Sequence, residues 1–255
     1  VPFIFVSALK ERDLPCKAPG RIVLELSSSG TSGQKSRIRL DAVSLARVLK
    51  MAGQVFSALG LAAPEQSADY LCFTYDPAVA KNLGTAWTDR LMTGFTRTGE
   101  VFYALKWDRE KKDFFFDRAG AVAALSCFES RGPVRLIGFP AFALEICADF
   151  KAAHGRYPKL HPESRVITGG GWKDKQDQSL DKAVFRRILA ARLGLPPEHV
   201  RDLFGMVEHG VPYVDCRLGR FHVPVYSRVI VRDPGTLKPL PFGNKGLLQF
   251  MTPYL

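Results

Sequence analysis

The sequence predicts an α/β protein in which helices cover a mostly parallel sheet. Three observations predict this class. Short apolar runs alternate with longer segments of helical periodicity, the segments between them are short, and 255 residues with 46% hydrophobic content can bury a substantial core. The tail from Phe221 to Phe250 is strand-rich instead, with turns at Asp233-Pro234-Gly235 and Phe242-Gly243-Asn244. We therefore expect an α/β region at 1–220 and a β-rich segment of the same large domain at 221–255.

The first half of the chain begins with an expected hairpin and a long helix. Residues 22–26 form an apolar run, and residues 37–40 alternate as a return strand would. Asp41 is placed to cap a helix that runs to about Leu59, where Gly60 supplies the stop. Further strands are expected at 70–75, 101–107 and 114–116, and residues 78–93 are ambiguous, with a helix around Trp87 as one interpretation.

The second half alternates strand and helix more regularly. Pro140 suits the first turn of the helix that follows the strand expected at 134–139, and Gly194 with Pro196 closes the next helix. The expected helices are 118–129, 141–154 and 180–193, and the expected strands are 134–139, 165–168 and 200–204. In such sheets ligands bind at the carboxyl ends of the strands, so a binding site is expected in the loops that follow the strands.

The segment Ser27–Ser36 has the chemistry of an anion-binding loop. It holds six hydroxyl residues, two glycines and Lys35, and glycine lets backbone N–H groups turn toward one concavity. Its spacing departs from the nucleotide loop G-x-x-x-x-G-K-S/T because Gln34 precedes the lysine. A plain Ser/Gly turn is the alternative. The residues proposed to bind phosphate are Ser28, Ser29, Gly30, Thr31, Ser32 and Gly33.

Two more loops stand at expected strand ends. Gly169-Gly170-Gly171-Trp172-Lys173 follows one strand, and Gly205-Met206-Val207-Glu208 follows the next. Glycine lets a backbone lie flat on a ligand, and a carboxylate at a strand end suits Mg²⁺. A plain glycine turn and a surface acid are the alternatives. His209 suits a supporting role or a structural one, and a zinc site with Cys216 and His222 lacks the usual ligand pairs.

The net charge indicates which partners to expect, and the cysteine content indicates the cellular compartment. Lys and Arg number 36 against 25 Asp and Glu, which gives a net charge of +11 and favours anionic partners. No Lys/Arg cluster is dense enough for a nucleic-acid patch, so no nucleic-acid partner is expected, and no apolar run approaches the length of a membrane span. Five scattered cysteines without a C-x-x-C favour a reducing cytoplasm. A chain that starts without Met and ends after an apolar strand is expected to be a fragment.

Together the three loops resemble motifs of the adenylate-forming enzymes. Residues 29–35, S-G-T-S-G-Q-K, are similar to their phosphate loop S/T-S-G-S/T-S/T-G-x-P/T-K, and F-G-M-V-E resembles their Y-G-x-T-E. The combination with G-G-G-W-K, with the opening P-F-I-F-V-S-A-L-K and with the tail segment G-N-K-G-L-L-Q-F resembles the acyl-protein synthetase (LuxE-like) family. Its best-known member is the ligase subunit of the bacterial luminescence fatty-acid reductase. The resemblance covers nearly the whole chain.

The resemblance implies an ATP- and Mg²⁺-dependent ligase that activates a fatty acid as acyl-adenylate and passes it to a protein cysteine thiol, from which a reductase or transferase partner collects it. It implies that Lys35 and the loop hold the phosphates, that Glu208 holds Mg²⁺, and that Gly169–Gly171 lie on adenine beside Trp172. Lys173 would face phosphate or carboxylate, and Gly205 and Met206 would complete the nucleotide site.

Some family features are missing from this sequence. Val207 replaces the usual Thr, and the ribose-binding Asp, the acyl-accepting Cys and the C-terminal lid with its catalytic Lys have no match in it. Two alternatives stay open: a ligase of the phenylacetate-CoA type that passes an acyl or aryl group to coenzyme A, and a non-catalytic domain that binds nucleotide or an acidic partner.

Overall fold

A seven-stranded sheet forms the centre of the protein in the computed structural model, which describes residues 3–12, 14, 21–28, 35–80 and 84–253. The strand order is β5-β4-β3-β6-β7-β8-β9, and the pairs from β4 to β8 are parallel, while β5 and β9 pair antiparallel at the two edges. This confirms the predicted mostly parallel sheet. The strands are β3 (Ala63–Tyr75), β4 (Thr96–Asp108), β5 (Asp113–Phe116), β6 (Val134–Gly138), β7 (Arg165–Gly169), β8 (Val200–Phe204) and β9 (Tyr213–Val214).

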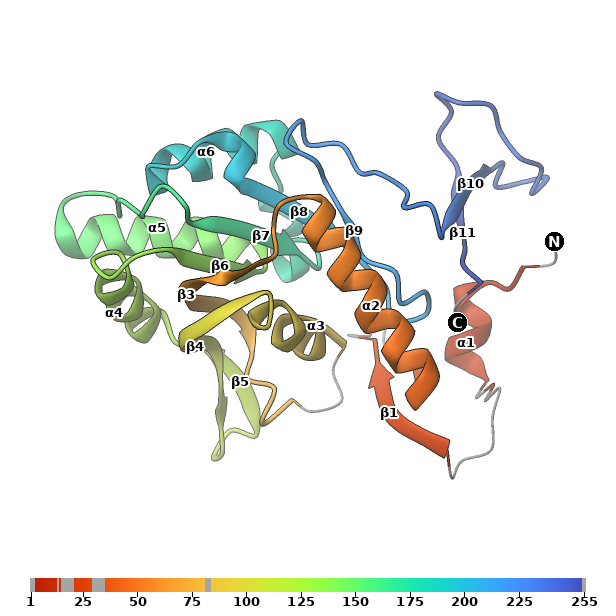
Figure 1. Ribbon diagram of the computed structural model, residues 1–255, viewed down its shortest axis with the longest axis horizontal. Helices are drawn as coiled ribbons and strands as arrows, with labels where there is room; N and C mark the ends of the chain where they lie inside the picture. The colour runs from red at the N-terminus through yellow and green to blue at the C-terminus, as the bar shows by residue number, and fades with distance from the viewer. Residues whose placement is uncertain (1–2, 13, 15–20, 29–34, 81–83, 254–255) are drawn as a thin grey trace.

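Helices cover both faces of this sheet (Figure 1). Successive residues of a strand point to opposite faces. Leu71 and Phe73 accordingly pack in one core cluster with α4, α5 and α6, whereas Tyr70 and Cys72 pack in another with α2 and α3. The helices are α2 (Ala42–Ala58), α3 (Gly84–Thr93), α4 (Arg118–Phe128), α5 (Pro140–His154) and α6 (Lys182–Leu193), with a short α1 at Val6–Glu11.

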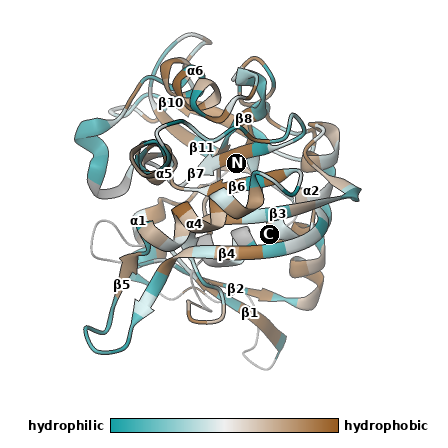
Figure 2. Ribbon diagram, turned by 90° about the vertical axis from the view of Figure 1, so that its left-hand side faces the viewer, coloured by the Kyte–Doolittle hydropathy of each residue, from teal (hydrophilic) through white to brown (hydrophobic). Residues whose placement is uncertain are grey.

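Helix ends follow the predicted signals. The Asp41 carboxylate accepts a hydrogen bond from the Ser44 N–H at 2.8 Å and caps α2. Pro140 occupies the first turn of α5, and Gly194 closes α6 in the left-handed conformation at φ 67°. The charged turn between β4 and β5 is hydrophilic and projects from the edge of the molecule (Figure 2).

Two small antiparallel hairpins stand outside the central sheet. β1 (Ile22–Ser27) pairs with β2 (Arg37–Asp41), and β10 (Arg228–Arg232) pairs with β11 (Leu247–Met251). A third core cluster joins the hairpins to α2 and β9; it includes Leu40, Met51, Tyr213 and Phe250. Both hairpins and α1 lie at the end of the molecule opposite α4 and α5 (Figure 1). No helix in the described part of the chain is long and apolar enough to cross a bilayer.

The predicted boundaries differ from the structure at three places. β3 and β4 begin at Ala63 and Thr96, well before the predicted starts, because polar residues at the head of each strand pair with the neighbouring strand. The tail is less strand-rich than expected, since β10 and β11 are its named strands in residues 221–253. β9 has two residues and carries no sequence signal of its own.

Candidate active site

The predicted phosphate loop follows β1 and leads into β2, which pair with each other. The Ser28 N–H donates to the Ser36 carbonyl at 3.1 Å, and the Ser36 N–H donates to Ser28 Oγ at 3.0 Å, which closes the base of the loop. Ser36 is fully buried, and its hydroxyl has no hydrogen-bond partner within the described residues. Lys35 is exposed at the end of the loop. Ser29, Gly30, Thr31, Ser32, Gly33 and Gln34 lie outside the described residues.

The triple-glycine segment turns at the carboxyl end of β7. Gly169 is opposite Leu203 of β8, and a Cβ on Gly169 would lie 2.6 Å from the Leu203 carbonyl oxygen. Gly170 and Gly171 follow with φ of 75° and 73°, a conformation that glycine adopts without cost. Glycine is thus required here by the close strand approach and by the turn, which explains the sequence pattern whether or not a nucleotide lies on it.

Trp172 and Lys173 leave this turn into a 3-10 helix, Lys173–Gln178. The Trp172 ring packs edge-on against Phe185 of α6, with ring centroids 5.7 Å apart and an interplanar angle of 76°. The indole is therefore only partly exposed and belongs in part to the core beneath α6.

Glu208 sits in a tight turn between β8 and β9. The His209 and Gly210 N–H groups donate to the Met206 carbonyl at 3.1 and 3.2 Å, and Gly210 has a φ of 68°. Glu208 is half-buried. Because β7 and β8 are parallel neighbours, the triple-glycine turn and Gly205 emerge at the same edge of the sheet.

A cavity of about 1090 Å³ brings the Glu208 turn and the hairpin together. Met206, Glu208 and His209 line one part of it, and β2 residues from Arg37 to Asp41 line another. Apolar residues of α1 and β11 complete its wall. The predicted residues Met206 and Glu208 therefore share a cavity with the strand that leaves the phosphate loop.

The chemistry of this wall suits a magnesium-bound polyphosphate. Mg²⁺ is commonly held by one or two carboxylates together with substrate phosphates and water, and Glu208 supplies one carboxylate. Arg37 and Arg39 add positive charge nearby, and Arg39 Nε is held by Glu25 at 2.8 Å. No group of three or more His, Cys, Asp or Glu suited to a metal occurs among the residues described.

His209, which follows Glu208 in the turn, is buried in a polar cluster. The sequence suggested a supporting or a structural role for His209 but did not indicate this cluster. Its Nε2 lies 2.7 Å from Tyr213 Oη, which lies 2.6 Å from Ser227 Oγ. Burial lowers the pKa of His209 to about 4, so the imidazole is neutral at pH 7. Sequence reasoning missed Tyr213 and Ser227, because neither adjoins a motif.

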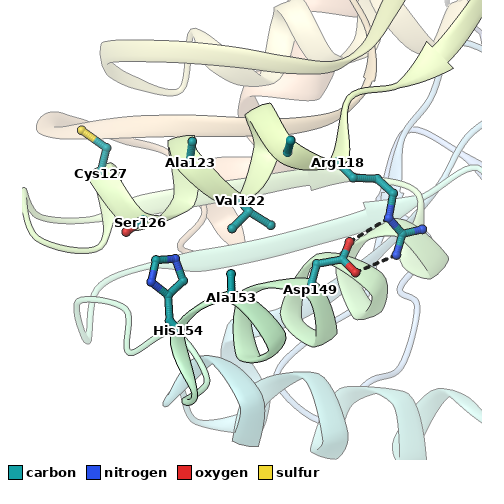
Figure 3. A pocket seen from close by; sticks show the side chains of 9 residues that line it. Arg118, Val122, Ala123, Ser126, Cys127, Asp149, Ala153 and His154 are labelled. Atoms are coloured by element: carbon teal, nitrogen blue, oxygen red, sulfur yellow. Dashed lines mark hydrogen bonds and ion pairs between the residues drawn. The ribbon is translucent and has the colours of Figure 1, made fainter.

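A second cavity of about 800 Å³ lies between α4 and α5 (Figure 3). Arg118 of α4 reaches across to Asp149 of α5 with two hydrogen bonds of 2.8 Å, and Val122, Ala123 and Ala153 form its apolar wall (Figure 3). None of the predicted site residues lines it. This groove is separate from the candidate site.

The chain is similar to known proteins along its whole length. The model of the family "Acyl-protein synthetase, LuxE" matches residues 1–255. The long-chain-fatty-acid–luciferin-component ligase of Aliivibrio fischeri is 30% identical over 263 residues, and that of Vibrio harveyi is 28% identical over 253 residues. Each match covers 98% of this chain and 64% of the relative, so the chain spans less than two thirds of either protein.

Solved structures show the same fold. ATP-bound MatB from Rhodopseudomonas palustris matches with a TM-score of 0.58 at 19% identity, over 94% of this chain and 41% of that one. A long-chain-fatty-acid-CoA ligase from Archaeoglobus fulgidus matches with a TM-score of 0.61 at 12% identity, over 92% of this chain and 42% of that one. The fold is that of the adenylate-forming enzymes, as the loop motifs predicted.

Proposed function

The chain belongs to the acyl-protein synthetase family, and we propose that the protein uses ATP to activate a fatty carboxylic acid and passes the acyl group to a protein cysteine thiol. The observation that carries this proposal is the shared cavity of Glu208 and the β2 strand that leaves the Ser/Gly loop. In the first step a carboxylate oxygen attacks the α-phosphorus of ATP, and the bond to pyrophosphate breaks. In the second step a thiolate attacks the acyl carbon of the acyl-adenylate and AMP leaves.

The residues take the roles that the motifs imply. Loop hydroxyl and N–H groups of Ser28–Gly33, with Lys35, would bind the β- and γ-phosphates and stabilise the charge on departing pyrophosphate. Glu208 would hold Mg²⁺, which screens the phosphate charge when bound. The backbone of Gly169–Gly171 would lie along adenine beside Trp172, with Gly205 and Met206 completing that wall. Lys173 would reach a phosphate or the substrate carboxylate.

The acceptor thiol is not assigned to a cysteine of this chain. Cys72 and Cys147 are fully buried in the core, and burial raises the pKa of Cys147 to about 12. Cys127 is exposed and Cys216 is partly exposed. The scattered spacing of the five cysteines, without a C-x-x-C, supports a reducing cytoplasm as the compartment. The names of the two relatives, which call the acceptor a luciferin component, support a reductase or transferase protein as the partner.

ATP–pyrophosphate exchange with a panel of carboxylic acids tests the first step. In the intact protein we expect Lys35→Ala and Glu208→Ala each to reduce exchange by about 10²–10³, the range measured when one group that stabilises transition-state charge is removed. Lys50→Ala on exposed α2 and Glu110→Ala in the exposed β4–β5 turn are the matched controls, and they should leave exchange unchanged. Normal exchange in both Lys35→Ala and Glu208→Ala would refute these roles.

The second step is tested by the fate of the acyl group. With a radioactive fatty acid and ATP, we expect a hydroxylamine-labile label on protein, as a thioester predicts. A labelled coenzyme A thioester, formed instead when coenzyme A is supplied, would replace the protein-thiol proposal with the coenzyme A ligase alternative. A protein that binds nucleotide but shows no exchange with any acid would favour a non-catalytic role.

A further inference from the structure

Next to Glu208 begins a chain of imidazole and hydroxyl groups, buried at His209 and Tyr213 and partly buried at Ser227, that joins three separate elements. His209 belongs to the Met206–Gly210 turn and is 6% exposed, and Tyr213 of β9 is 3% exposed. Ser227 stands just before β10, and its Oγ lies 3.1 Å from the carbonyl oxygen of Met251 in β11. The motif turn is thus connected, through two hydroxyl groups, to the β10–β11 hairpin, which also lines the cavity.

The direction of the hydrogen bonds follows from the last acceptor. The Met251 carbonyl can only accept, so Ser227 uses its single hydroxyl proton there and accepts from Tyr213. The Tyr213 hydroxyl in turn donates its hydrogen bond to Ser227 Oγ and accepts one from His209 Nε2. This order fixes the proton of the neutral imidazole on Nε2. His209 Nε2 also lies 3.4 Å from Ser227 Oγ, so the three side chains form one closed group in which the two bonds to the Tyr213 hydroxyl are the shorter ones.

Aromatic packing holds the same groups in place. The His209 and Tyr213 rings are almost parallel, with an interplanar angle of 6° and centroids 5.7 Å apart. The Phe250 ring of β11 lies 5.2 Å from His209 and 5.5 Å from Tyr213. Removing the Tyr213 hydroxyl alone would therefore remove the two short hydrogen bonds, leaving only the 3.4 Å contact between His209 Nε2 and Ser227 Oγ, and would leave the ring packing intact.

We propose that His209, Tyr213 and Ser227 form a positioning clamp that fixes the Glu208 turn against the β10–β11 hairpin, so that the hairpin controls the affinity of Glu208 for its cation. The inference rests on the proposed role of Glu208 and adds the group that orients it. Groups that orient a metal ligand commonly change metal affinity or activity by 10- to 100-fold when removed. None of the three clamp residues contacts the reacting atoms in this proposal; they act through the backbone of the turn.

The test compares Tyr213→Phe with Tyr70→Phe. Tyr70 is the matched control because its hydroxyl is also buried and also bonded to a single hydroxyl, Thr96 Oγ1 at 2.6 Å, but it lies in the core below α2 and α3. In ATP–pyrophosphate exchange we expect Tyr213→Phe to raise the Mg²⁺ concentration at half-maximal rate about tenfold, with the rate at saturating Mg²⁺ nearly retained. Ser227→Ala should likewise raise the Mg²⁺ requirement and retain the rate at saturating Mg²⁺, and Tyr70→Phe should leave the Mg²⁺ dependence unchanged.

A second measurement does not depend on activity. Hydrogen–deuterium exchange of the amides at 207–210 should be faster in Tyr213→Phe than in the wild-type protein or in Tyr70→Phe. Wild-type Mg²⁺ dependence and wild-type amide exchange in Tyr213→Phe would overturn the clamp and leave the proposed function standing. If the wild-type protein shows no pyrophosphate exchange, the proposed function fails, and unchanged amide exchange then also refutes the clamp, whereas faster exchange supports its structural part.

Discussion

At the scale of single residues, Cys216 has surroundings that none of the other described cysteines shares. Asp215 and Phe221 form an isolated antiparallel bridge, and the Cys216 N–H donates to the Arg220 carbonyl at 2.9 Å. Lys182 contacts both bridge residues on one face, with Nζ 3.5 Å from Asp215 Oδ2 and 3.9 Å from the centre of the Phe221 ring. By alternation, Cys216 lies on the other face, where Arg220 and His222 also project.

This environment makes the Cys216 thiol more acidic than usual. Hydrogen bonds from the Arg220 backbone N–H and from the His222 side chain lower the pKa of Cys216 to about 7. The thiolate is the nucleophile, so its alkylation rate should rise with pH through a midpoint of about 7. Peptide mass spectrometry after timed iodoacetamide labelling measures this rate, with exposed Cys127 as a reference and buried Cys147 as a negative control.

His222→Gln should move that midpoint to higher pH because it removes the second cause of the lowered pKa. The backbone contribution from Arg220 remains in the variant. An unchanged midpoint in His222→Gln would show that the imidazole does not act on this thiol.

At the scale of elements, the contact between β7 and β8 sets the geometry of the triple-glycine turn. A Cβ on Gly169 would meet the Leu203 carbonyl oxygen at 2.6 Å, whereas a Cβ on Gly171 would meet nothing within 4 Å. Gly169→Ala must push two paired strands apart, and we expect a loss of about 3 kcal/mol in the free energy of unfolding. Gly171→Ala meets only the left-handed backbone strain, about 1–2 kcal/mol. Urea denaturation compares the two, and equal losses would contradict the strand-contact explanation.

The same elements show how far sequence reasoning reaches. The central parts of strands and helices were predictable because their signals are local. Apolar runs mark the strands, and the helix ends are set by nearby residues such as Asp41, Pro140 and Gly194. The polar start of β3 was not predictable, because its strand conformation comes from pairing with the start of β4 and not from its own side chains.

The candidate site divides in the same way. Glu208 and the glycine turn were predicted from contiguous motifs at strand ends, and the structure places Met206 and Glu208 on one cavity with β2. The partners of His209 could not be predicted, since Tyr213, Ser227 and Met251 meet it only after β9 and the β10–β11 hairpin fold back. A site residue that belongs to a contiguous motif can be predicted from the sequence, whereas a contact between distant segments cannot.

At the scale of the whole molecule, the central sheet and the hairpins differ in what holds them. The sheet has a buried cluster on each face. Of the three clusters in the described residues, the third is the one through which the two hairpins pack against α2 and β9. A two-stranded ribbon is marginally stable without such packing. The cavity lined by Glu208 therefore lies between the turn that joins β8 to β9 of the sheet and the more weakly anchored hairpins.

This asymmetry predicts a graded pattern of native-state hydrogen exchange. We expect amides of β1, β2, β10 and β11 to exchange through local openings well before those of β3, β6 and β7, whose protection should approach the global free energy of unfolding. Addition of Mg²⁺, ATP and a fatty acid should slow exchange in β2, at 207–210 and in β11 together, because all three line one cavity and a ligand there stabilises the closed arrangement. A single common exchange rate for hairpins and sheet would show that they unfold as one unit. Protection confined to β2 would show that the ligand does not engage the Glu208 side, and the idea that hairpin closure governs the site would then have to be abandoned.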